Sequence, residues 1–201
     1  MPVSPHRAAP GRIRIIGGHL RNSRLDVPEL AGLRPTAERV RETLFNWLAP
    51  VIAGARCLDL FAGTGALGIE ALSRGAASLQ LVERDPRVAQ ALRGNLTRLR
   101  LDRAEVSAQD AQAFLQPSAG TPPHGTFDLV FLDPPFALDL WASTGRQLEQ
   151  GGWLAPAAWI YVESPRDAAP ALPATWLPHR QGQAGEVAYA LYRRSASVPL
   201  S

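Results

Sequence analysis

Two short motifs place residues capable of chemistry next to glycines and prolines. The first is Asp59-Leu-Phe-Ala-Gly63-Thr-Gly65, and the second is Asp133-Pro134-Pro135-Phe136. Each follows a short apolar run of the kind that forms a buried strand. Because the carboxyl ends of parallel strands lie at the same edge of a sheet, we expect the two motifs to meet in one crevice.

The glycine motif has the features of a nucleoside-binding loop. Its glycines let the backbone approach a ligand, and the following helix begins with free N–H donors. Glu83 stands at the end of the next expected strand, where a carboxylate can accept both ribose hydroxyls. Asp110 ends the third strand and can accept a hydrogen bond from an adenine amino group. The predicted cofactor-binding residues are Asp59, Phe61, Gly63, Gly65, Glu83, Arg84, Asp110 and Ala111.

Two cofactors are compatible with this loop. Residues Gly63-Thr-Gly65-Ala-Leu-Gly68 also satisfy the G-x-G-x-x-G pattern of dinucleotide sites, and Glu83 lies at the expected offset. Asp59 favours S-adenosylmethionine, because its carboxylate can hold the ammonium of a methionine moiety and would repel a pyrophosphate. An NAD-dependent oxidoreductase is the first alternative. It gives Asp133–Phe136 no task, and the chain contains no lysine, which removes several dehydrogenase mechanisms.

The second motif predicts methylation of an exocyclic amine. A strand that runs into two prolines stops pairing, so the Pro134 carbonyl is free to point into the crevice beside Asp133. Two acceptors held together match the two hydrogens of an NH₂ group and direct its lone pair at a methyl donor. Phe136 offers a face on which a base can stack. The predicted catalytic residues are therefore Asp133, Pro134 and Phe136.

Positive charge is concentrated at the N-terminus. Residues 1–41 hold eight arginines against three acids, a net charge of +5, whereas the other 160 residues hold 13 arginines and 15 acids, a net charge of −2. This asymmetry is typical of a polyanion-binding segment, and a solvated basic face without a partner is the alternative. The predicted RNA-binding residues are Arg12, Arg14, Arg21, Arg24, Arg34 and Arg39.

Composition narrows the class of protein. The chain has 201 residues, 46% of them hydrophobic, and a single cysteine, Cys57. It shows neither the apolar core of a signal peptide nor a run of about 18 apolar residues. Its four histidines are scattered, so we predict no metal site. We expect a soluble, cytoplasmic protein without a membrane partner, and a monomer by default.

The order of expected elements predicts an α/β fold. Candidate strands at 56–61, 78–83, 104–108, 127–132 and 158–163 alternate with helices near 65–74, 86–99, 110–116 and 138–150. Strands separated by helices imply a doubly wound, mostly parallel, Rossmann-like sheet. Extended segments at 176–180 and 187–193 predict an antiparallel hairpin at the sheet edge. The segment 116–125, rich in Pro, Gly and Ser, is predicted to be a surface loop.

The N-terminal segment has its own pattern. Residues 12–16 alternate polar and apolar side chains, Gly17-Gly18 predicts a tight turn, and a second strand is expected over 19–27. Thr36 is the expected cap of a helix that ends at Trp47 or Leu48, with Arg39, Arg41 and Glu42 off its apolar stripe. We therefore expect a basic hairpin and helix extension over 1–50 and a catalytic domain over 51–201.

Together these motifs resemble amino-methyltransferases of nucleic acids. The block Arg12-Ile-Arg-Ile-Ile-Gly-Gly, followed by Arg34-Pro-Thr-Ala-Glu-Arg-Val-Arg-Glu-Thr-Leu-Phe-Asn-Trp-Leu48, resembles more narrowly the RsmD family. The resemblance extends to the Gly-Glu-Val-Ala-Tyr-Ala-Leu-Tyr strand near the C-terminus. It implies the seven-stranded class I methyltransferase fold, S-adenosylmethionine as cofactor, and methylation of the guanine N2 at position 966 of 16S ribosomal RNA, free or in the small subunit.

Two further alternatives share some of these residues. A DNA adenine-N6 methyltransferase would use the same Asp133–Phe136 motif, but only 65 residues follow Phe136 and the sheet needs most of them. A ribosome-binding factor with an inactive cofactor site would use the basic N-terminus. The acids at positions 59, 83, 110 and 133 argue against that second alternative.

Overall fold

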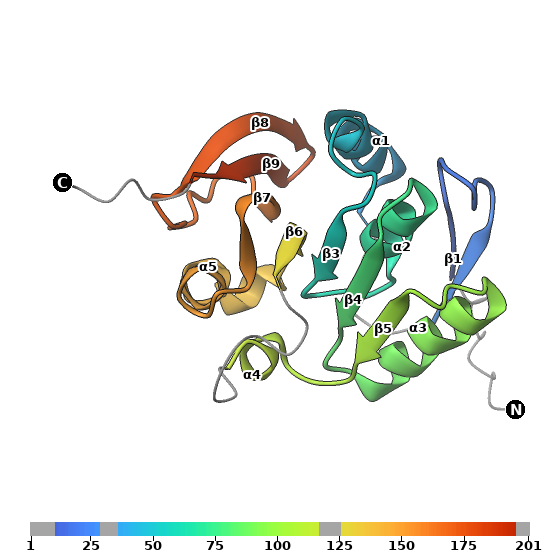
Figure 1. Cartoon of the computed structure of the whole chain (residues 1–201). Helices are drawn as coiled ribbons and strands as arrows, with labels where there is room; N and C mark the ends of the chain where they lie inside the picture. The colour runs from blue at the N-terminus through green and yellow to red at the C-terminus, as the bar shows by residue number, and fades with distance from the viewer. Residues whose placement is uncertain (1–10, 29–35, 117–125, 196–201) are drawn as a thin grey trace, which may run out of the picture.

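A computed structural model describes residues 11–28, 36–116 and 126–195. Seven strands form one sheet in the order β5-β4-β3-β6-β7-β9-β8 (Figure 1). Neighbours among the first five strands of this order are parallel, and β9 pairs antiparallel with both β7 and β8. The strands are β3 (Arg56–Asp59), β4 (Ser78–Val82), β5 (Ala104–Ser107), β6 (Phe127–Leu132), β7 (Leu154–Pro165), β8 (Trp176–Ala184) and β9 (Val187–Arg194). The predicted α/β fold, with its C-terminal hairpin at the sheet edge, is confirmed.

Helices cover both faces of the sheet. Side chains alternate along β6, so Leu129 and Phe131 join one core while Val130 and Leu132 join the other. The first core contains residues of α1, α2 and α3, and the second contains residues of α4 and α5. The helices are α1 (Glu38–Leu48), α2 (Ala66–Ser73), α3 (Pro86–Arg98), α4 (Ala111–Phe114) and α5 (Trp141–Gln150).

Element boundaries differ from the prediction in several places: β7 begins at Leu154 instead of residue 158, β8 ends at Ala184 instead of residue 180, and the region of the second motif also differs. The predicted strand 127–132 coincides with β6, but the helix predicted from 138 begins at Trp141. Residues Phe136–Leu138 form a separate 3₁₀ turn, and Asp139 then takes a positive φ of 46°. The chain therefore reverses direction before α5 starts. Of the predicted 116–125 loop, residues 117–125 lie outside the described part of the chain.

The N-terminal hairpin consists of β1 (Gly11–Arg14) and β2 (Arg24–Val27), which pair antiparallel. The predicted tight turn at Gly17-Gly18 is wrong, because the connection runs from residue 15 to residue 23. In Figure 1 the hairpin stands beside α3. The Asn95 side chain of α3 exchanges hydrogen bonds of 3.0 and 2.9 Å with the backbone of Asp26.

The two glycines of that connection serve a close approach to α2 instead of a turn. A Cβ on Gly18, whose φ is +76°, would lie 1.8 Å from the carbonyl oxygen of Ser73. The Ser73 hydroxyl donates a 2.5 Å hydrogen bond to the Gly17 carbonyl. The amide of His19 donates to the Ser73 carbonyl at 2.9 Å. These contacts dock the hairpin on the end of α2.

A buried acid of α2 completes this docking. Both oxygens of Glu70 accept backbone N–H groups, from Ile16 and Gly17, at 2.8 Å each. Its cationic partners are Arg74, at 2.8 Å, and Arg41, at 3.6 Å. Arg41 was expected off the apolar stripe of α1, yet it is only 3% exposed. The prediction missed it because its partner lies on a distant element.

Candidate active site

The glycine loop connects β3 to α2 through a tight turn. Gly63 and Gly65 have φ values of 48° and 75°, and Gly65 is the residue before the first turn of α2. The amide of Gly65 donates to the carbonyl of Ala62 at 2.7 Å. A Cβ on Gly65 would lie 2.6 Å from Leu92. Glycine is thus required here both by the backbone conformation and by close packing.

Glu83 follows β4 and is hydrogen-bonded to this loop. It accepts the N–H of Gly63 at 2.9 Å with one oxygen and the N–H of Asp85 at 2.8 Å with the other. A carboxylate has about four acceptor positions, so each oxygen keeps one for a ligand hydroxyl. The neighbouring Arg84 is exposed. The structure thus places Glu83 next to the glycine loop, as the sequence predicted.

Asp110 is found at the amino end of α4. Its Oδ1 accepts the N–H groups of Gln112 and Ala113, at 2.8 and 3.3 Å, so it is the N-cap of this helix. Ala111 is buried beneath it. Both capping bonds use the same oxygen, which leaves Oδ2 as the atom for the predicted contact with an adenine amino group.

Asp59, at the end of β3, is buried and only 3% exposed. It accepts the N–H of Gly68 at 3.2 Å. Burial raises the pKa of Asp59 to about 7, and the nearby charges of Glu83 and Glu163 act in the same direction, against hydrogen bonds from Gly68 and Phe61. Within the described chain Asp59 forms no ion pair, so a cation at this position would stabilise its charged form.

Asp133 lies on the same face of the sheet as Asp59. Asp59 pairs with Phe131 of β6, and alternation along the strand puts residues 131 and 133 on one side. Burial raises the pKa of Asp133 well above its usual value, and the charges of Glu163 and Asp59 raise it further. Asp59, Asp133 and the glycine loop line one small hollow, together with Phe61, Thr64, Leu67 and Thr36.

The residues after Asp133 run from the hollow into a 3₁₀ turn that has no buried residue. Pro134 is buried, whereas Pro135 is exposed and begins the 3₁₀ turn that contains Phe136. The Phe136 ring is half-buried and packs against Trp141, with 5.8 Å between ring centroids. The indole N–H of Trp141 donates to the Glu163 carbonyl at 2.7 Å. Phe136 is thus partly exposed, and its packing against Trp141 holds the ring in place.

Sequence reasoning missed Thr36 and Glu163. Thr36 is not the helix cap that the sequence predicted, because Ala37 occupies that position and makes no capping bond. The Thr36 hydroxyl instead donates to Glu163 of β7 at 2.9 Å. The alternation Tyr161-Val-Glu163 was visible in the sequence, but only the sheet order reveals that β7 lies beside β6. Thr36, which lines the hollow, thus connects Glu163 to it.

The comparisons decide which family this geometry belongs to. The family described as "Conserved hypothetical protein 95" matches residues 13–193. The Ribosomal RNA small subunit methyltransferase D of Escherichia coli (strain K12) is 52% identical, over 96% of this chain and 95% of its own. The protein of the same name from Haemophilus influenzae is 45% identical, over 92% and 95%. The chain belongs to the family described as "Conserved hypothetical protein 95". The resemblance predicted from the N-terminal block is thereby confirmed.

A solved structure agrees with this family assignment. The structure titled "Putative methyltransferase yhhF from Escherichia coli" has a TM-score of 0.83 and 52% identity. The match covers 93% of this chain and all of that one. The two chains therefore share one fold over nearly their whole length.

The predicted RNA-binding arginines of this family member lie mostly on the exposed side of the hairpin. Arg12, Arg14 and Arg24 alternate with buried Ile13 and Leu25. Arg21 and Arg39 are also exposed, and Arg34 lies outside the described residues.

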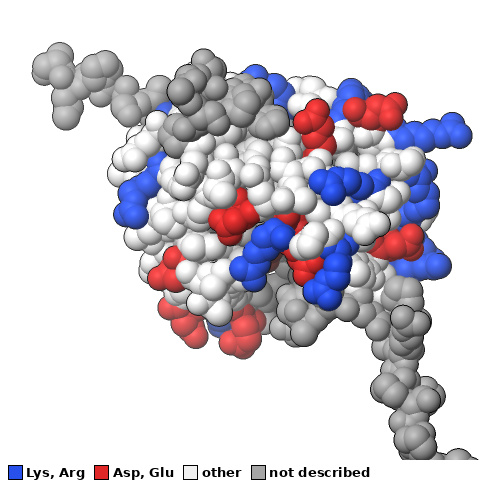
Figure 2. All heavy atoms as spheres, turned by 90° about the horizontal axis from the view of Figure 1, so that it is seen from below, with Lys and Arg blue, Asp and Glu red and all other residues white. Residues whose placement is uncertain are grey.

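Two of these arginines contact acids at the surface. Arg12 lies 3.7 Å from Asp26, and Arg14 contacts Glu38. Exposed pairs of this kind contribute only about 0–1 kcal/mol to stability, so both arginines remain available to bind a phosphate. Figure 2, which views the molecule from below, shows arginines and acids interspersed on that face.

No cluster of three or more potential metal ligands occurs among the described residues. No helix in the part of the chain that the structure describes is long and apolar enough to cross a bilayer.

Proposed function

We propose that this protein transfers a methyl group from S-adenosylmethionine to the exocyclic N2 of a guanine in 16S ribosomal RNA, at position 966. The observation that carries the proposal is the single hollow that joins the glycine loop, Asp59 and Asp133. Its family relatives are named small-subunit ribosomal RNA methyltransferases. The hollow supplies acceptors for a cationic cofactor on one side and for an amine on the other.

The cofactor half of the site fits a nucleoside that carries an ammonium group. Asp59 is a buried acid without a cationic partner among the described residues, and burial raises its pKa to about 7. Glu83 has free acceptor positions for ribose hydroxyls, and Asp110 has one free oxygen for an adenine amine. Phe61, Gly63, Gly65, Arg84 and Ala111 complete the proposed cofactor-binding set. S-adenosylmethionine supplies the methyl group as an electrophilic sulfonium.

The target half fits an exocyclic amine. Asp133 and the Pro134 carbonyl provide two fixed acceptors for the amine hydrogens, which keeps the nitrogen lone pair out of the base ring system. Phe136 stacks on the base, and its packing on Trp141 fixes the ring in advance. A guanine presents its amine next to an N1–H, and these two neighbouring donors suit an acidic crevice.

The alternatives explain less of this geometry. A dinucleotide would bring a pyrophosphate against Asp59, whose burial already disfavours its charge. A DNA adenine-N6 methyltransferase would share the motif, but the described strands after Phe136 are used by the sheet itself. A binding factor without catalysis would have no use for three neighbouring acids whose pKa values are all raised by burial. Methyl transfer to RNA uses all of these features.

Two measurements test the proposal. The protein is incubated with methyl-labelled S-adenosylmethionine and either unmodified 16S ribosomal RNA or small subunits, and the labelled nucleoside is identified by mass spectrometry. We expect N2-methylguanosine. Label on adenine, or no label with any RNA, would contradict it. In a thermal-shift assay S-adenosylmethionine should raise the melting temperature by mass action, and NAD should not.

A further inference from the structure

Glu163 is a buried acid hydrogen-bonded to Thr36, one of the residues that line the hollow. Its side chain lies on β7 and the residue is 5% exposed. Its Oε1 accepts two hydroxyl hydrogens, from Thr36 at 2.9 Å and from Tyr161 at 2.8 Å. No arginine or histidine of the described chain pairs with it. A buried carboxylate without a cation is costly, and such groups are concentrated at functional sites.

Sheet register puts Glu163 next to Asp133. Leu132 of β6 pairs with Val162 of β7, so residues 133 and 163 follow side by side and point to the same face. The other titratable groups around the pair are Asp59 on β3, Tyr161 on β7 and, beyond it, Tyr189 on β9. None of them is a cation. The two carboxylates therefore compete for protons and titrate as a unit.

The hydrogen bonds make the two acids unequal. Burial raises the pKa of Glu163, but the hydroxyls of Tyr161 and Thr36 favour its charged form and act in the opposite direction. For Asp133 every influence raises the pKa: burial first, then the charge of Glu163, then that of Asp59. The shared proton thus belongs on Asp133, which makes Asp133 the more basic of the two carboxylates.

We propose that Glu163 is a positioning residue for methyl transfer: its carboxylate, held by Thr36 and Tyr161 beside Asp133, makes Asp133 the proton acceptor of the reaction. The inference rests on the proposed function and deepens it, because it names Asp133, and not water, as the group that accepts the amine proton. In the step itself the nitrogen lone pair forms the N–C bond, the S–C bond breaks with its electron pair going to sulfur, and the N–H proton passes to Asp133.

The test is the pH dependence of the single-turnover rate. In the wild type the rate should fall at low pH as Asp133 becomes protonated. Glu163→Gln removes the neighbouring negative charge, so Asp133 should lose its proton more readily. We expect the acid limb to move to lower pH and the plateau rate to fall by about tenfold, because a less basic Asp133 is a weaker acceptor. The KM for RNA should change little.

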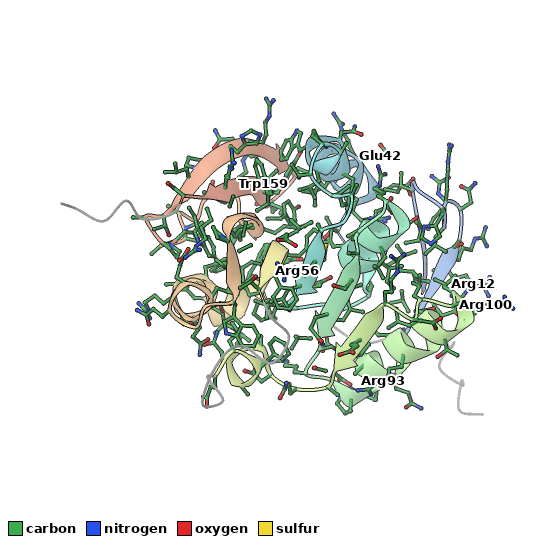
Figure 3. The ribbon with its side chains drawn as sticks, viewed as in Figure 1. Arg12, Glu42, Arg56, Arg93, Arg100 and Trp159 are labelled. Carbon is green, nitrogen blue, oxygen red and sulfur yellow. The ribbon has the colours of Figure 1, made fainter. Side chains whose placement is uncertain are left out.

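A matched control makes the same chemical change elsewhere. Glu42 lies on the outer side of α1, with its side chain directed away from the sheet (Figure 3). Glu42→Gln should leave both the position of the acid limb and the plateau unchanged.

A second variant keeps the test valid if Glu163→Gln does not fold. Tyr161→Phe keeps the ring, which packs on Phe131 at 6.3 Å between centroids, and removes one hydroxyl from Glu163. Glu163 should then bind its proton more tightly, and the acid limb should move in the same direction by a smaller amount. If neither variant moves the limb, Glu163 is only structural and the inference is wrong. A wild type that methylates no RNA would instead overturn the proposed function, and this inference with it.

Discussion

Buried acids occur in two regions of this molecule, and their surroundings are opposite. Glu70, beneath the hairpin, has two arginines and two backbone N–H groups as partners. Asp59, Asp133 and Glu163, in the crevice, have hydroxyl or backbone donors at most, and the described chain gives them no cation. The first region satisfies its charge internally and holds the fold together. The second leaves its charges for a ligand.

The hairpin anchor should show the largest effect on stability. Glu70→Ala leaves Arg41 buried without its acid and removes the acceptors for Ile16 and Gly17. Removing one partner of a buried ion pair costs about 3–5 kcal/mol. We expect the free energy of unfolding, measured by urea denaturation, to fall by that amount. The same substitution at exposed Glu105 should cost less than about 0.5 kcal/mol. Equal losses would mean that the anchor contributes nothing special.

In the crevice, Asp133→Ala should have the opposite effect from Glu70→Ala: it should lower activity and leave stability intact. Losing one of two fixed acceptors should lower the single-turnover rate by roughly 10²–10³-fold, while the affinity for S-adenosylmethionine changes little. Because Asp133 has no ionic partner among the described residues and burial disfavours its charge, its removal should not lower the free energy of unfolding. Rapid-quench kinetics and calorimetry measure the two quantities. Near wild-type turnover would show that paired acceptors are not how the amine is activated, and the exposed Asp167→Ala serves as control.

Asp59 should make the stability of the protein depend on pH. Its pKa in the folded protein is about 7, above the ordinary value of 3.8, so the folded state binds a proton that the unfolded state has released. Without ligand, stability should therefore fall as pH rises from about 4 through 7. An ammonium group favours the ionised acid, so stabilisation by S-adenosylmethionine should grow over the upper part of that range. Melting temperatures with and without ligand measure both trends, and Asp59→Asn should flatten them.

Local chemistry made much of the site predictable. Asp59 and the glycines of its loop, Glu83 after β4, and the double proline after β6 each depend on a few neighbouring residues. What failed depends on residues brought together by the sheet. Glu163 lies beside Asp133 only because β7 pairs with β6, and Thr36 turns from the helix towards it.

The same reason explains the errors outside the site. Gly17 and Gly18 have the composition of a tight turn, but the close approach of Gly18 to Ser73 on α2 determines their conformation. Arg41 is of a residue type that is usually solvated, but here it is buried and its charge is paired with Glu70. In both cases a long-range partner decided between two locally acceptable conformations. The boundary at residue 50 between extension and catalytic domain remains a prediction of the same kind.

The smallest and most specific effect should come from the exposed arginines of the hairpin. Arg12, Arg14, Arg21 and Arg24 are all solvent-accessible, and their contacts with Asp26 and Glu38 are weak surface pairs. Each phosphate that such a residue neutralises should contribute roughly −0.7 to −0.9 to the slope of log affinity against log salt. Replacing all four by glutamine should flatten that slope for 16S ribosomal RNA and leave cofactor affinity and melting temperature nearly unchanged.

Arg146 on α5 provides the matched control for charge alone. It is exposed but lies on the other face of the sheet from the hairpin. Arg146→Gln should leave the slope unchanged, which would separate a phosphate contact from a general loss of positive charge. If the fourfold variant and the wild type have the same slope, the hairpin is not an RNA-binding arm. The hairpin, which is docked through Glu70, would then contribute to stability alone. The two regions would differ only in that one stabilises the fold and the other carries out catalysis.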